Sequence, residues 1–112
     1  MFRKSYDFAL RVVEICKRIH KEKKEFVLSK QLLRSGTSIG ANIAEANGAI
    51  SKADFSAKIS ISYKESLEAK YWLSILKDSD YLDQKEANKL IVGADELSRI
   101  MFAILKTTRI AK

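Results

Sequence analysis

The chain has 112 residues, of which 46% are hydrophobic and 31% charged, and its formal net charge is +7. This length and composition fit one domain with a single core and exclude a disordered chain. Cys16 is the sole cysteine, so an internal disulfide framework is excluded, and no apolar run approaches the ~18 residues of a membrane-spanning helix. We therefore expect no membrane association and a cytoplasmic location.

The complete lack of proline, with only four glycines, predicts long helices joined by short loops. A first helix over residues 5–21 would be capped by Ser5, with Cys16 as a buried small hydrophobe. A second helix over residues 29–47 would be capped by Ser29 and end at Gly48 in the left-handed conformation.

A third helix is predicted over residues 51–78 and a fourth over residues 83–106. Each opens with a short polar side chain followed three residues later by an acidic one, the pattern of a capping box. The pairs are Ser51 with Asp54, and Asp83 with Glu86. Short connections favour antiparallel neighbours, so we expect a single all-α domain over 1–112, an antiparallel up-down-up-down four-helix bundle.

The positive charge is concentrated near the amino terminus. Residues 1–34 carry ten Lys and Arg against four acidic residues, whereas the remaining 78 residues are nearly balanced. A local basic surface suggests a polyanionic partner such as RNA or DNA, although solubility alone could account for it. The candidate nucleic-acid-binding residues are Arg3, Lys4, Arg11, Lys17, Arg18, Lys21, Lys23 and Lys24.

Small residues dominate residues 34–46, where Ile39 and Ile43 mark one apolar face. Such a segment lets another helix come close, and the spacing of Gly36 and Gly40 is typical of a close helix crossing. It is a packing motif and offers few catalytic side chains.

Apolar residues are in surplus on the fourth predicted helix, which predicts a homo-oligomer. The alternative is that this helix lies deeper in a monomeric core. The expected oligomer-interface residues are Ser38 and Ala41 on the second helix and Ile91, Ile100 and Phe102 on the fourth.

Acidic residues within otherwise packed helices could form either an anionic site or a structural polar network, and we favour the structural network. Its expected members are Arg34, Asn42, Glu45, Glu65 and Glu68. The only histidine, His20, has no Glu three residues before it and is expected to face solvent within a lysine-rich run. No metal site, cofactor or enzymatic activity is therefore expected.

Nearly the whole chain resembles the four-helix-bundle proteins encoded in intervening sequences of 23S ribosomal RNA genes. The residues that carry the resemblance are 29–46, Ser51, 54–55, Lys58, 64–65, Glu68 and 71–73. A relative of that family is the accessory variability protein of diversity-generating retroelements, a basic pentameric bundle that binds nucleic acid. The resemblance implies a homopentamer and RNA or DNA binding, and it implies no enzymatic activity.

Together these patterns predict a non-enzymatic oligomeric bundle that binds RNA or DNA through phosphates, without sequence specificity. The alternative function is a structural or adaptor oligomer that binds a protein partner.

Overall fold

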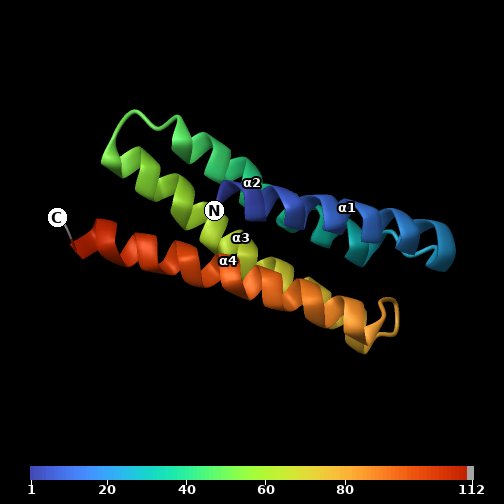
Figure 1. Cartoon of the computed structure of the whole chain (residues 1–112). Coiled ribbons are helices and arrows are strands. Elements are labelled where there is room, and N and C mark those ends of the chain that lie inside the picture. Colours follow the sequence, from blue (N-terminus) through green and yellow to red (C-terminus); the bar gives the residue numbers. More distant parts are fainter. Residues whose placement is uncertain (111–112) are drawn as a thin grey trace.

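The computed structural model describes the backbone of residues 1–110 and the side chains up to Thr108. Its helices are α1 (Phe2–Lys23), α2 (Val27–Asn47), α3 (Lys52–Asp78) and α4 (Gln84–Ile110). Helices consecutive in the chain pack against one another, and α1 also meets α4 (Figure 1). This arrangement, 48 × 21 × 20 Å, confirms the predicted all-α four-helix bundle. Within residues 1–110, no helix is both long and apolar enough to cross a membrane.

The predicted starts of α3 and α4 are confirmed. Ser51 Oγ accepts a hydrogen bond from the Asp54 backbone N–H at 3.0 Å, and an Asp83 carboxylate oxygen accepts one from the Glu86 N–H at 3.2 Å. These bonds satisfy backbone donors that have no partner within the helix. The end of α4 differs, because the helix continues to Ile110 where residue 106 was expected.

The predicted caps of α1 and α2 are wrong. Ser5 and Ser29 are both buried inside their helices, and each hydroxyl donates to a preceding backbone carbonyl, that of Phe2 at 2.6 Å and that of Glu25 at 2.9 Å. A serine that satisfies itself in this way can occupy a helix interior, so it need not mark a helix start. Gly48 ends α2 as expected, but with φ −100° it lies outside the left-handed region.

The left-handed positions instead belong to Lys24, after α1, and Asp80, after α3, with φ of 53° and 65°. After α3, the N–H groups of Tyr81 and Leu82 both donate to the Leu76 carbonyl, closing the helix end. These turns keep the loops short and hold neighbouring helices antiparallel.

The helices α1 and α2 meet through the predicted close crossing. A Cβ atom added at Gly36 would lie 2.9 Å from Val12 Cγ1, and one at Gly40 would lie 3.2 Å from Ser5 Oγ. Both distances are below ordinary van der Waals contact, so a side chain at either position would force its neighbour on α1 to shift. The small-residue segment is thus used for packing within the subunit.

The core combines aliphatic side chains with small polar ones. Ser66 and Ser98 hydroxyls lie 2.7 Å apart between α3 and α4, and Ser62 Oγ donates to the Ile39 carbonyl of α2 at 2.8 Å. Such bonds remove the penalty of burying hydroxyls while permitting close helix contacts. The buried serines are Ser5, Ser29, Ser35, Ser62, Ser66 and Ser98.

At one end the bundle has three helices rather than four. The 22-residue α1 is shorter than the 27-residue α3 and α4. The first turn of α1 lies beside the middle of α2 and α4, since Ser5 lies next to Gly40 and Lys4 pairs with Glu96. The end formed by the α2–α3 connection and the last turns of α4 therefore extends beyond α1 (Figure 1). There Ile100 and Ile104 are only half-buried.

The close crossing predicts opposite effects for two glycine substitutions. Gly36→Ala should lower the free energy of unfolding by about 1–3 kcal/mol, because the buried, stiff Val12 cannot move away. Gly93→Ala should raise it by up to about 1 kcal/mol, since its Cβ would contact Phe8 at an ordinary 3.6 Å while alanine favours the helix. Urea unfolding of both variants measures this, and equal effects would contradict the assigned crossing.

Candidate functional site

Three of the eight predicted nucleic-acid-binding residues are engaged in ion pairs. Lys4 pairs with Glu96, and Arg18 pairs with Glu86 at 2.6 Å, both bridging α1 to α4. Arg3 pairs with Asp7 one turn along α1 at 3.4 Å and lies over the Tyr6 ring. The hydrogen bond to Glu86 raises the pKa of Arg18 above its ordinary value. The partners Glu86 and Glu96 lie on α4, far from α1 in the sequence, and were not predicted.

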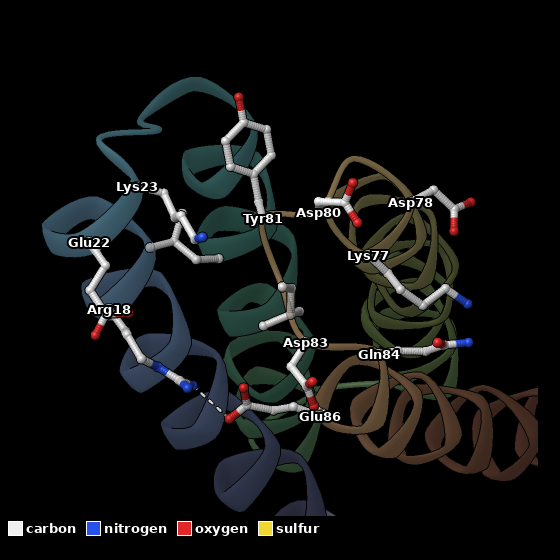
Figure 2. Close-up of a pocket in the computed structure, with 12 residues that line it drawn as sticks. Arg18, Glu22, Lys23, Lys77, Asp78, Asp80, Tyr81, Asp83, Gln84 and Glu86 are labelled. Carbon is white, nitrogen blue, oxygen red and sulfur yellow. Dashed lines mark hydrogen bonds and ion pairs between the residues drawn. The ribbon is translucent and has the colours of Figure 1, made fainter.

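A groove follows the α1–α4 seam that these ion pairs bridge. One of its cavities, about 690 Å³, lies between the end of α1, the α3–α4 loop and the start of α4 (Figure 2). Figure 2 shows Arg18 and Glu86 meeting across it. The charged lining residues are Arg18, Glu22, Lys23, Lys77, Asp78, Asp80, Asp83 and Glu86. Carboxylates outnumber cations here, so this cavity offers no attraction for phosphates.

Lys17, Lys21 and Lys24 form a different surface. They recur at three- and four-residue spacing, which places them on one side of α1 and its carboxyl end, and all three are exposed. Lys23 precedes Lys24 and is also exposed, but it lines the cavity at the end of α1 and does not lie on this side of the helix. Among the described side chains, no carboxylate lies within ion-pair distance of these lysines or of Arg11, which lines the α1–α4 groove. We call Lys17, Lys21 and Lys24 the lysine cluster.

The loop next to the lysine cluster is held in one conformation by Glu25. Its carboxylate accepts hydrogen bonds from the backbone N–H groups of Val27, Leu28 and Ser29 at 2.8–3.0 Å. Burial alone would raise the pKa of Glu25, but these backbone donors lower it below its ordinary value. Sequence reasoning missed this cap, although a carboxylate just before the first apolar residues of α2 was the available signal.

His20 does not face solvent as expected. It is half-buried, its Nε2 lies 2.8 Å from Ser29 Oγ, and its ring lies 5.1 Å from that of Phe26. Cys16 is buried, as predicted, and its Sγ donates to the Ser29 carbonyl at 3.3 Å. Burial, with a smaller effect from the Glu25 charge, raises the pKa of Cys16 to about 11, so the thiolate is disfavoured at neutral pH.

The expected polar network is divided into separate parts on the α2–α3 face. Arg34 pairs with both Glu65, at 3.2 Å, and Glu68, and Glu68 also accepts from Trp72 Nε1 at 3.0 Å. Glu45 instead pairs with Lys58 at 3.0 Å, and Asn42 donates to the Ser38 carbonyl of its own helix. Every carboxylate in the set thus has a cationic partner within the subunit, which fits a structural role.

The predicted oligomer-interface residues differ in exposure. Ala41 and Phe102 are exposed, whereas Ser38, Ile91 and Ile100 are half-buried. Ile91 packs against the core of its own subunit, and the Phe102 ring lies 6.0 Å from that of Tyr63. Val92 is a further exposed apolar residue on α4. The apolar surplus of α4 is therefore partly consumed within the subunit.

Among the described residues, no group of three or more His, Cys, Asp or Glu side chains is placed to hold a metal ion. A family model described as 23S rRNA-intervening sequence protein matches residues 1–103. A crystal structure from Bacteroides thetaiotaomicron, described as a protein with unknown function from the S23 ribosomal protein family, is 44% identical with a TM-score of 0.92. The match covers 94% of this chain and 97% of that chain. No curated protein matches this chain.

The Glu25 cap predicts a pH-dependent contribution to stability. A carboxylate whose folded pKa is lowered stabilises the fold above its unfolded pKa, about 4.3, and loses that effect as the pH falls through the folded value. Glu25→Ala should therefore cost about 1 kcal/mol at neutral pH. The deficit should shrink in acid, as measured by thermal unfolding across pH. A deficit that does not change with pH would contradict this role for the charge.

Proposed function

Since this chain belongs to the 23S rRNA-intervening sequence protein family, we propose that it is a non-enzymatic accessory protein that binds RNA or DNA through phosphates. The observation that carries this proposal is the lysine cluster. Its ammonium groups project from the end of α1 with no carboxylate among the described side chains close enough to neutralise them. Such cations release counterions from a polyanion, which supplies most of the free energy of non-specific binding.

The binding surface is smaller than the full set of eight predicted residues. Lys4 and Arg18 are held by α4 carboxylates, so using them would require breaking those pairs. Lysine acts as a point charge rather than as a planar fork that reads base edges. Recognition of phosphates with little sequence preference is the behaviour that this surface supports.

Assembly into a homo-oligomer, with five subunits as the expected number, would compensate for a small surface. Several copies of the lysine cluster on one particle can engage one strand, and the resulting avidity exceeds the affinity of a single copy. Exposed apolar side chains on α4 support such assembly, since 67% of Val92 and 55% of Phe102 is exposed in the single chain.

The same α4 residues favour a second candidate function. An apolar helix face flanked by charged residues also suits a protein partner, so the oligomer could act as an adaptor whose lysines provide solubility. The two functions differ in what they require, because an adaptor working through α4 should not depend on the lysine cluster.

Charge removal separates these functions. The triple variant Lys17→Gln, Lys21→Gln, Lys24→Gln should weaken binding to unrelated RNA and DNA oligonucleotides and reduce the slope of log affinity against log salt by about 0.7–0.9 per lost contact. Fluorescence anisotropy between low and physiological salt measures both quantities.

A matched control removes the same charge elsewhere. Lys52→Gln, Lys64→Gln, Lys106→Gln alters three exposed lysines on α3 and α4 and should leave affinity and slope close to those of the wild type. If both triple variants lost the same affinity, the lysine cluster would contribute only through the net charge of the protein and would not be a binding surface. Absence of wild-type binding at low salt would end the nucleic-acid proposal.

Assembly through α4 predicts a change in subunit number. Val92→Asp with Phe102→Asp should lower the molar mass measured by light scattering at micromolar concentration, because two charges would be buried without partners. Ile50→Asp is the control, since Ile50 is 93% exposed in the α2–α3 loop and its substitution should leave the mass unchanged. A monomeric wild type would contradict this prediction.

A further inference from the structure

One exposed aromatic side chain lies beside the lysine cluster. Phe26 is the last residue of the three-residue loop between α1 and α2, and 55% of it is exposed. Lys24 precedes it by two residues, and Lys30, also exposed, follows it by one helical turn on α2. Phe26 therefore has an exposed lysine close by in the chain on either side, one in the loop and one on α2.

The structure fixes the Phe26 ring in place. One side of the ring contacts His20, with the ring centroids 5.1 Å apart. His20 is held in turn by the hydroxyl of the fully buried Ser29, which donates to the Glu25 carbonyl. The backbone on either side is fixed by the left-handed Lys24 and by the hydrogen bonds to the Glu25 carboxylate. An exposed ring ordered before binding loses little conformational freedom when a ligand stacks on it.

We propose that Phe26 is a stacking platform for an unpaired base, so that this end of the bundle binds single-stranded nucleic acid in preference to duplex. The inference rests on the proposed function, to which it adds the class of nucleic acid. Phosphates on either side of the stacked base would contact the lysine cluster and Lys30. Aromatic rings combined with a basic surface are the usual means of binding single strands without reading their sequence.

The alternative occupant of a basic surface with an exposed aromatic is an anionic membrane. Phe26 and its neighbour Val27 supply only two exposed apolar side chains here, and the residues around them are lysines. That is little apolar surface for insertion between lipids, whereas one ring suffices for one base. Duplex offers no equivalent ligand, because its bases are already stacked on each other.

Substitution of Phe26 tests the platform. Phe26→Ala should weaken binding of a single-stranded RNA or DNA oligonucleotide about tenfold, with little change for the same sequence annealed to its complement. The salt slope should stay at the wild-type value, because stacking releases no counterions, whereas Lys24→Gln should reduce it by about 0.7. Phe26→Trp should retain affinity, and its fluorescence should be quenched by the single strand beyond any quenching of Trp72 in the wild type.

Two controls separate stacking from general apolar contact. Phe26→Leu keeps an apolar side chain without a flat ring and should lose affinity as Phe26→Ala does. Tyr71→Ala removes a comparably exposed aromatic side chain, 57%, from α3, whose described backbone does not closely approach that of α1. This variant should bind as the wild type does. Circular dichroism confirms that each variant remains folded.

Several outcomes would overturn the inference. Equal binding of single strands by wild type and Phe26→Ala would remove the platform while leaving the proposed function intact. Equal losses on single strand and duplex would also remove it. Dependence on Phe26 for phosphatidylserine vesicles but not for oligonucleotides would assign this surface to membranes. If the wild type binds no nucleic acid even at low salt, the proposed function fails and the platform with it.

Discussion

The spacing between α1 and α2 is the constraint on which the rest of the bundle depends. Without side chains at Gly36 and Gly40, Val12 and Ser5 approach the backbone of α2, and α1 is held tightly on that side. Among the described helices, α1 also packs against α4, through a smaller interface than the one it makes with α2. Long charged side chains, such as Arg18 and Glu86, span the outer part of that seam, while Phe8 packs near Gly93 within it. The close α1–α2 crossing therefore contrasts with the α1–α4 seam, which is bridged by charged side chains.

This division sorts the basic residues of the first helix into two populations. Lys4 and Arg18 meet carboxylates of α4 and help to position α1, whereas the lysine cluster extends from the exposed side of α1 and its carboxyl end, near Phe26 in the chain. Surface ion pairs contribute little to stability, so the first population matters mainly for geometry. The lysines of the second population are not neutralised by carboxylates, so their positive electrostatic field can attract a polyanion. Local charge in the sequence therefore overstates the available binding surface.

The sequence sufficed for the architecture because hydrophobic periodicity, two capping boxes and the glycine spacing are all local or short-range signals. It failed at Ser5 and Ser29, where a hydroxyl that usually caps a helix is instead buried and donates to a preceding backbone carbonyl, that of Phe2 or that of Glu25. The candidate site was harder to predict, since the partners of Lys4 and Arg18 lie on α4, far away in the sequence. No local pattern reports such pairs. The proposed stacking role of Phe26 likewise depends on the position of its ring against His20, which in turn contacts Ser29, and these contacts form only on folding.

The unequal lengths of the helices have a consequence for motion. Beyond Ser5, the ends of α2 and α4 share their core with α3 alone, and Ile100 and Ile104 remain half-buried. Fewer buried contacts lower the free energy of a sub-global opening that leaves the rest of the molecule intact. Backbone amides in this three-helix section should accordingly exchange with deuterium sooner than those beneath α1. In an assembly, a subunit that covers this three-helix section would also make its sub-global opening less frequent.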